Sequence, residues 1–169
     1  MELYPFKFDL ILKPTIWGGD RIAKLKGINR AAECVGESWE ISDVPSSESV
    51  IMNGELKNKS LKDIISVYKQ EIVGKSVYNK FETSFPLLIK FIDACGDLSI
   101  QVHPDDQVAQ IRHSSPGKTE MWYVVDAMPD SELILGFRKN SSKEEYLEKL
   151  SNNSLEDILQ NVPVEKGDV

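Results

Sequence analysis

Short segments in which apolar and polar side chains alternate, each closed by a proline or glycine, limit the fold of this chain more than any other feature. The clearest is 98–103, with the sequence LSIQVH, which Pro104 ends. Side chains two residues apart on a strand point to the same face, so the polar residues of this segment share one side. The same alternation predicts strands at 37–42, 121–125 and 133–135, the last two as candidates for a hairpin. The sequence therefore predicts a framework of short β-strands.

Two further strand predictions involve residues that strand interiors rarely tolerate. An alternating segment at 8–12 is expected to end at Pro14, with a turn at 17–19, WGG. Residues 87–92, LLIKFI, form a nearly unbroken apolar run, which is typical of a strand buried on both faces. Lys90 lies inside that run, and burying an ammonium is costly unless it meets an anion or hydrogen-bond partners. The sequence therefore predicts either an anion or hydrogen-bond partners beside Lys90, and a phosphate would be such an anion.

Helices are predicted where the apolar period changes from two residues to three or four. One lies in 60–80, where Ser60 and Asp63 form a pattern of the capping-box type. Two more are expected within 141–160. Short strands with inserted helices predict a single mainly β domain over 1–169, an antiparallel barrel or sandwich with helical decoration.

Composition narrows the range of partners. The formal net charge of −7 and the scattered lysines and arginines argue against nucleic acid, although two or three well-placed cations could still bind an anionic small molecule. No leader is expected, and no apolar run approaches the roughly 18 to 20 residues that cross a bilayer, so we expect a cytoplasmic protein without a membrane partner. Cys34 and Cys95 lack the spacing of a redox or metal motif and are predicted to be small buried apolar residues.

Gln101, His103 and Glu120 are the candidates for chemistry. Residues i and i+2 on a strand present adjacent side chains roughly 6 to 7 Å apart, which suits one metal ion held between an oxygen and a nitrogen donor. A carboxylate from a neighbouring strand would complete three ligands and leave one position open for water or substrate, as catalytic metal sites require. Glu120 lies where the next predicted strand begins.

Spacing alone leaves other interpretations open. Glutamine is an uncommon ligand, and a histidine beside a proline at a strand end is often a hydrogen-bonded core or turn residue. His113 lies in a polar stretch and is expected to be a surface histidine. Asp105 and Asp106 follow Pro104 and are predicted to be a helix N-cap and a first-turn acid without a catalytic role.

The segments 98–106, LSIQVHPDD, and 118–123, KTEMWY, resemble the two signature segments of class I mannose-6-phosphate isomerases, with the spacing found in that family. The segments 17–19, WGG, and 36–40, GESWE, are similar to the shorter bacterial branch. The resemblance implies a cupin fold, a jelly-roll type β-barrel. It also implies one Zn²⁺ per chain and a phosphosugar substrate.

The resemblance also implies roles for individual residues. Gln101, His103 and Glu120 match the family's zinc ligands, and Lys118 and Glu120 match catalytic positions. Four positions match residues that contact or line the substrate site: Ser99, Lys90, Lys118 and Trp39. For Trp39 and Lys118, a core tryptophan and a solvated loop lysine are the plain alternatives.

The implied reaction interconverts mannose 6-phosphate and fructose 6-phosphate through an enediol. The family's fourth ligand, a histidine, and its catalytic arginine are expected beyond Val169, so the barrel is expected to be incomplete at the C-terminus and the family's C-terminal cupin half to be absent. Two alternatives remain: a cupin module that binds metal and sugar phosphate without turnover, and an isomerase of another phosphosugar such as glucose 6-phosphate. We expect a monomer or a weak homodimer.

Overall fold

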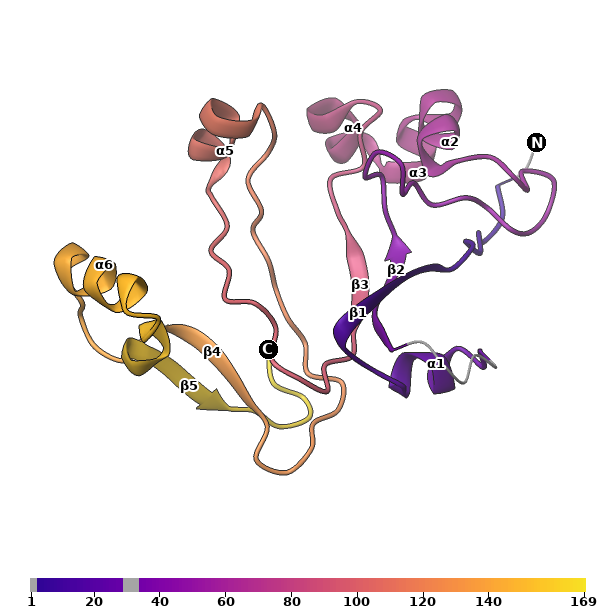
Figure 1. Cartoon of the computed structure of the whole chain (residues 1–169). Coiled ribbons are helices and arrows are strands. Elements are labelled where there is room, and N and C mark those ends of the chain that lie inside the picture. Colours follow the sequence, from indigo (N-terminus) through magenta and orange to yellow (C-terminus); the bar gives the residue numbers. More distant parts are fainter. Residues whose placement is uncertain (1–2, 29–33) are drawn as a thin grey trace. The chain divides into compact units, whose positions relative to one another are not determined.

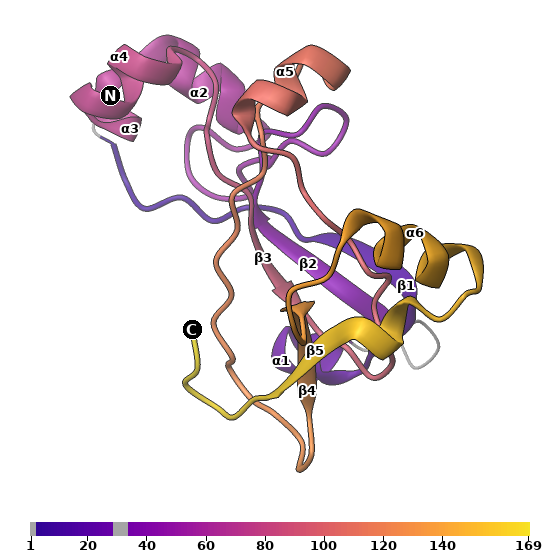
Figure 2. The same cartoon turned by 90° about the vertical axis from the view of Figure 1, so that its left-hand side faces the viewer.

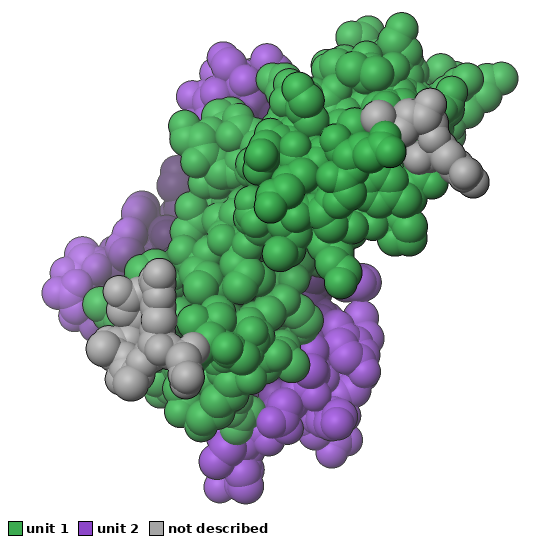
Figure 3. Space-filling view, turned by 90° about the vertical axis from the view of Figure 1, so that its right-hand side faces the viewer, with its two compact units in different colours: residues 1–98 green, residues 99–169 purple. Residues whose placement is uncertain are grey.

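The computed structural model describes residues 3–28 and 34–169. The chain divides into two compact units, residues 1–98 and residues 99–169, which Figure 3 colours green and purple. Each unit has its own sheet and its own helices, and each is described by itself below.

A three-stranded antiparallel sheet forms the centre of the first unit (Figure 1). Its strands, in spatial order, are β1 (Ile11–Gly19), β2 (Val35–Ile41) and β3 (Ile89–Ile92). Strand β2 confirms the strand predicted at 37–42.

Strand β1 continues through the proline that was expected to end it. The pairing of β1 with β2 shifts register between Lys13 and Pro14 and again between Pro14 and Gly19, and such irregularities are where strands accept proline. The turn predicted at 17–19 is therefore wrong, because these residues belong to β1. Glycine is required at Gly18, where a β-carbon would lie 2.5 Å from the backbone nitrogen of Gly36.

The described residues of the first unit form four short helices: α1 (Arg21–Leu25), α2 (Leu61–Tyr68), α3 (Gln70–Val73) and α4 (Lys75–Phe81). The predicted capping box is present at the start of α2, where the Ser60 side chain accepts a hydrogen bond from the Asp63 amide and Asp63 accepts one from the Ser60 amide. Helix α2 turns its apolar face to the core of the unit. That core contains Ile51, Leu56 and Ile64.

Strand β3 is shorter and less buried than its sequence predicts. It begins at Ile89, and Leu87 before it is 58% exposed. In the sheet order of the described residues β3 pairs with β2 and lies at the edge. Burial on both faces was the wrong prediction, because an apolar run does not specify what covers each face.

The second unit consists of helices and a two-stranded antiparallel sheet (Figures 1 and 2). Its elements are α5 (Asp106–His113), β4 (Glu132–Phe137), α6 (Lys143–Ser151), the 3₁₀ helix η1 (Leu155–Ile158) and β5 (Leu159–Pro163). Both α-helices begin at a capping side chain, and at α6, which lies where a helix was predicted, the Ser142 hydroxyl accepts from the Glu145 amide.

Two predicted strands are absent from the sheets of the described residues. Segments 98–103 and 121–125 have no strand pairing, and β4, predicted at 133–135, pairs with β5 rather than with 121–125. Val124 exchanges backbone hydrogen bonds with Gly167 and Asp168 instead. Alternation alone cannot make a strand, since a strand also needs a neighbour for its backbone groups. Accordingly, the sheets of the described residues do not close into a barrel.

The prediction that both cysteines are buried is also wrong: Cys34 and Cys95 are exposed, and the Cys95 thiol donates to the Gly18 carbonyl oxygen. Within 3–28 and 34–169, no helix combines the length and the apolar character needed to cross a bilayer.

Candidate functional site

The predicted site residues fall into two sets, one in each unit. Ser99, Gln101, His103, Lys118 and Glu120 belong to the second unit, and Trp39 and Lys90 to the first. Each set is described within its own unit.

Glu120 connects the members of the second-unit set. One carboxylate oxygen, Oε2, lies 3.1 Å from His103 Nε2, and the other, Oε1, lies 3.3 Å from Lys118 Nζ. The His103 and Glu120 side chains are 25% and 31% exposed, so both are partly shielded and still open to a small molecule. The carboxylate thus has one oxygen toward an imidazole and the other toward an ammonium.

Gln101 contacts the other predicted residue of its segment, because its amide nitrogen donates to the Ser99 hydroxyl at 2.7 Å. This hydrogen bond gives the nitrogen and the oxygen of the Gln101 amide different roles. The nitrogen is used by Ser99, so the carbonyl oxygen is the atom left to act as a ligand.

The chain brings His103 and Glu120 together through a closed loop that contains α5. Asp105 is the N-cap of this helix, accepting from the Val108 amide at 2.8 Å, and Asp106 is in its first turn, so both predictions are confirmed. His113 is exposed in the last turn of the helix, as expected. After the helix the chain returns past Pro104, whose carbonyl oxygen accepts from the Lys118 amide at 3.2 Å.

The second-unit set can be tested for its fit to zinc by the separation of its donors. Two ligands about 2.1 Å from one tetrahedral zinc lie about 3.4 Å apart. The His103 and Glu120 atoms, 3.1 Å apart, are therefore placed as two neighbouring ligands would be, after an adjustment of a few tenths of an ångström. Among the described residues, no group of three or more His, Cys, Asp and Glu is placed to hold a metal. The sequence offers a third donor of another type, the Gln101 amide oxygen, and the contact that the structure shows for this side chain is with Ser99.

The first-unit set is joined by a residue that sequence reasoning missed, Glu37. Its Oε1 lies 2.8 Å from Lys90 Nζ, and its Oε2 accepts from the Trp39 indole nitrogen at 2.7 Å. The anion predicted beside Lys90 is thus a carboxylate of the chain itself. Glu37 and Trp39 alternate on β2, and Trp39 pairs in register with Lys90 on β3. That alternation, together with a lysine in need of an anion, was the signal that could have revealed Glu37.

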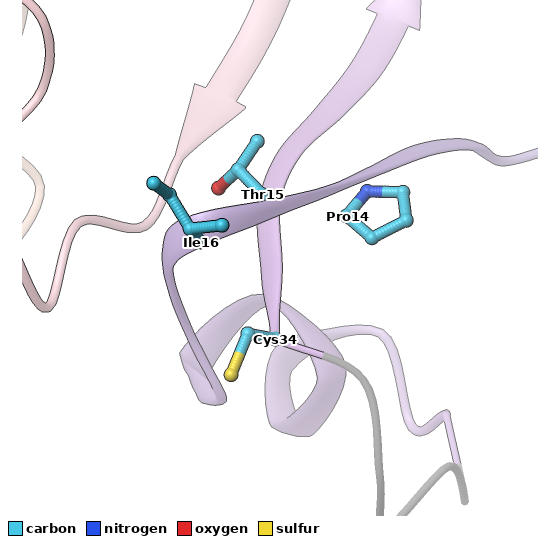
Figure 4. Close-up of a pocket in the computed structure, with 4 residues that line it drawn as sticks. All are labelled: Pro14, Thr15, Ile16 and Cys34. Atoms are coloured by element: carbon cyan, nitrogen blue, oxygen red, sulfur yellow. The ribbon is translucent and has the colours of Figure 1, made fainter.

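A hollow of about 310 Å³ elsewhere in the first unit is lined by Pro14, Thr15, Ile16 and Cys34 (Figure 4). None of these side chains carries a charge or an imidazole. None of the predicted site residues is among the described residues that line the hollow.

The structure brings an imidazole nitrogen, a carboxylate and an ammonium together in the second unit, and the contact of the Gln101 amide is with Ser99. Comparison with known proteins specifies the family. The family described as "Phosphomannose isomerase type I, catalytic domain" matches residues 6–154. This chain belongs to the type I phosphomannose isomerase family.

Individual relatives agree with this assignment. The mannose-6-phosphate isomerase of Streptococcus mutans is 38% identical over 153 residues, which cover 90% of this chain and 46% of that protein. ManA of Bacillus subtilis, also a mannose-6-phosphate isomerase, is 33% identical over 169 residues, covering 99% of this chain and 51% of that protein. The chain spans about half the length of these relatives.

The fold agrees as well. A crystal structure of the mannose 6-phosphate isomerase from Bacillus subtilis superposes with a TM-score of 0.84 at 33% identity, covering 97% of this chain and 51% of that one. The coarse fold prediction, β strands with inserted helices of this isomerase type, is thereby confirmed.

Proposed function

We propose that this chain provides the metal-binding part of a mannose-6-phosphate isomerase and holds one Zn²⁺ through Gln101, His103 and Glu120. The observation that carries the proposal is the 3.1 Å separation of His103 Nε2 and Glu120 Oε2 in a chain of this family. The jelly-roll cupin barrel and the single domain over 1–169 belong to the same proposal.

A zinc ion in this place would supply Lewis acidity, stabilising negative charge on the sugar carbonyl oxygen as a proton moves between C2 and C1. The residues of the chain do the rest. For zinc to bind, His103 and Glu120, now 3.1 Å apart, would turn this nitrogen and oxygen toward the ion, and the Ser99 hydroxyl accepts from the Gln101 amide nitrogen and leaves its oxygen for the metal. The second Glu120 oxygen lies 3.3 Å from Lys118, which would favour the charged carboxylate.

Phosphosugar recognition is assigned to Ser99, Lys90, Lys118 and Trp39. An ammonium has three N–H donors, so Lys118 can keep its ion pair with Glu120 and also donate to a phosphate or to an oxygen on the reacting carbons. Lys90 can likewise keep its ion pair with Glu37 and donate to an oxygen of the sugar. Holding the phosphate converts binding energy into orientation of the reacting carbons.

Lys118 and Glu120 are proposed as the catalytic residues. In this proposal the Lys118 ammonium stabilises negative charge that develops on the substrate. Glu120 would hold the metal ion close to the substrate. We further propose that the partner is a small phosphosugar, not a nucleic acid or a membrane, and that the protein acts in the cytoplasm as a monomer or weak homodimer.

Zinc content and isomerisation of mannose 6-phosphate, measured on the 169-residue chain and on a polypeptide of the relatives' length, test the proposal. We expect zinc in both and turnover in the longer form, because three ligands bind metal without a complete acid and base machinery. Zinc in neither form would refute the metal site. Zinc without turnover in the longer form would favour the alternative of a metal- and sugar-phosphate-binding cupin module.

The phosphosugar is tested by comparing mannose 6-phosphate with glucose 6-phosphate in the same assay. The assignment of Lys90 is tested by Lys90→Met, which keeps much of the length of the side chain but removes the ammonium that would donate to the substrate. A hydrogen bond to a charged group is worth about 1.5–3 kcal/mol, so we expect substrate affinity to fall at least about tenfold. Lys26→Met, at the lysine that pairs with Glu40 of the same unit, is the matched control and should leave affinity unchanged.

A further inference from the structure

The loop that joins His103 to Glu120 is closed by contacts outside any sheet. His103 and Glu120 lie in extended segments that have no strand pairing among the described residues, so no β-ladder fixes one against the other. Two hydrogen bonds close the loop at the base of α5. The Gly117 amide donates to Asp106 Oδ1 at 2.9 Å, and the Lys118 amide donates to the Pro104 carbonyl oxygen at 3.2 Å.

Gly117 makes the close approach of the two segments sterically feasible. A β-carbon at this position would lie 2.5 Å from the Asp105 carbonyl carbon, 2.5 Å from the Asp106 nitrogen and 2.8 Å from the Pro104 oxygen. All three are backbone atoms, which cannot rotate aside, so any larger residue would push the returning chain away from the start of α5. Glu120 follows three residues later on that returning chain.

The two aspartates at the start of α5 bind different parts of the chain. Asp105 accepts from the Val108 amide and therefore stabilises the helix itself. Asp106 is in the first turn, where an acid ordinarily serves the helix dipole, but its Oδ1 accepts from Gly117 beyond the end of the helix. The two functions can thus be separated by substitution.

We infer that Asp106 is a positioning residue for the metal site: by holding the Gly117 amide it sets the register of the returning chain and so brings Glu120 within ligand distance of His103. The inference rests on the proposed zinc role of this pair. Groups that orient metal ligands change metal affinity by about 10–100-fold when they are removed. Because the Asp106 to Gly117 bond is exposed, the lower end of that range is expected.

The test measures the zinc dissociation constant of the 169-residue chain by competition with a chromophoric chelator. We expect Asp106→Ala and Gly117→Ala each to weaken zinc binding about tenfold or more. Asp106→Asn keeps an oxygen that accepts from Gly117 and should retain the original affinity. Asp105→Ala is the matched control, since it removes the helix cap and leaves the Gly117 bond in place, and it should change affinity less than about threefold by the same reasoning.

Equal zinc affinity in Asp106→Ala and the unsubstituted chain would overturn the inference, as would equal losses in Asp105→Ala and Asp106→Ala. If the unsubstituted chain takes up no zinc, the proposed metal role fails, and the inference is decided by the nuclear Overhauser effect between the His103 ring and the Glu120 side chain. Its loss in Asp106→Ala with recovery in Asp106→Asn supports positioning by Asp106. Its persistence in Asp106→Ala refutes it.

Discussion

The two units differ in what holds them together. Residues 1–98 contain a three-stranded sheet and a core that includes Ile51, Ile64 and Ile65, each at most 2% exposed. In residues 99–169 the described apolar side chains that are buried are Ala109, Ile158 and Leu159, while Val102 and Met121, beside the proposed ligands, are 92% and 79% exposed. The first unit is organised by apolar burial, and the proposed site of the second by polar contacts between exposed segments.

This difference predicts that stability and metal binding can be changed independently. Apolar burial is the main favourable term in folding, so a deletion in the core should act on unfolding alone. Hydrogen bonds between exposed segments contribute less to stability, but they set distances between atoms. Substitutions near His103 should therefore act on metal affinity with little change in unfolding.

The largest effect on stability is expected from Ile64→Ala in the core of the first unit. Ile64 is 2% exposed on the buried face of α2, and truncating such a residue costs about 2–5 kcal/mol because it leaves a cavity. Urea denaturation followed by tryptophan fluorescence measures the loss. Val67→Ala on the same helix, at a residue 68% exposed, is the control and should cost under about 1 kcal/mol. Similar costs for both would refute a core at this position.

The second effect is on metal affinity. His103→Ala removes a proposed ligand and should weaken zinc binding by more than about 100-fold, beyond the range for groups that only orient ligands. His113→Ala removes the other histidine, exposed at the end of α5, and should leave affinity unchanged. Isothermal titration calorimetry with zinc measures the affinity of both variants. Equal losses of zinc affinity would show that zinc binds histidine non-specifically. The free energy of unfolding should change little in either variant.

The smallest effect comes from one substitution made in both units. Ser60→Ala and Ser142→Ala each remove a side chain that caps a helix, at a cost of about 1 kcal/mol. We expect Ser60→Ala to lower the global unfolding free energy, because α2 contributes to the core, whereas Ser142→Ala should increase only local amide exchange in α6, which has no buried residues. Global destabilisation by both would remove the contrast between the units.

The cap on α2 also has a predicted pH dependence. Hydrogen bonds from Ser60 hold the pKa of Asp63 below its ordinary value of 3.8. A carboxyl with a lowered pKa in the folded state stabilises that state above its unfolded pKa and loses this contribution as the pH falls through the folded one. Protection of the α2 amides from exchange should therefore decrease in acid below pH 3.8, and Asp63→Asn should remove that dependence.

Features set by local contacts could be predicted from the sequence. The capping box at Ser60 and the N-cap at Asp105 depend on neighbours within a few residues. Strand β2 was marked by its own alternation, although its pairing with β1 and β3 is distant in sequence. The ligand candidates were identified by alternation and by resemblance, and the structure adds the approach of His103 to Glu120.

Features set by distant partners could not be predicted in this way. Strand β1 passes Pro14 because its pairing with β2 shifts there, and nothing in the local pattern specifies that shift. The carboxylate beside Lys90 is that of Glu37 on another strand, and the sequence around Lys90 does not distinguish this carboxylate from a bound phosphate. The alternation at 98–103 predicted a strand, and it could not say whether a neighbouring strand is present to pair with it.

The most direct test of the account is a crystal structure of the chain grown with zinc, with anomalous data collected at the zinc absorption edge. The account predicts one anomalous peak per chain about 2.0–2.2 Å from His103 Nε2, a Glu120 carboxylate oxygen and the Gln101 amide oxygen. A peak bound by other residues, or none near His103 and Glu120, would contradict it.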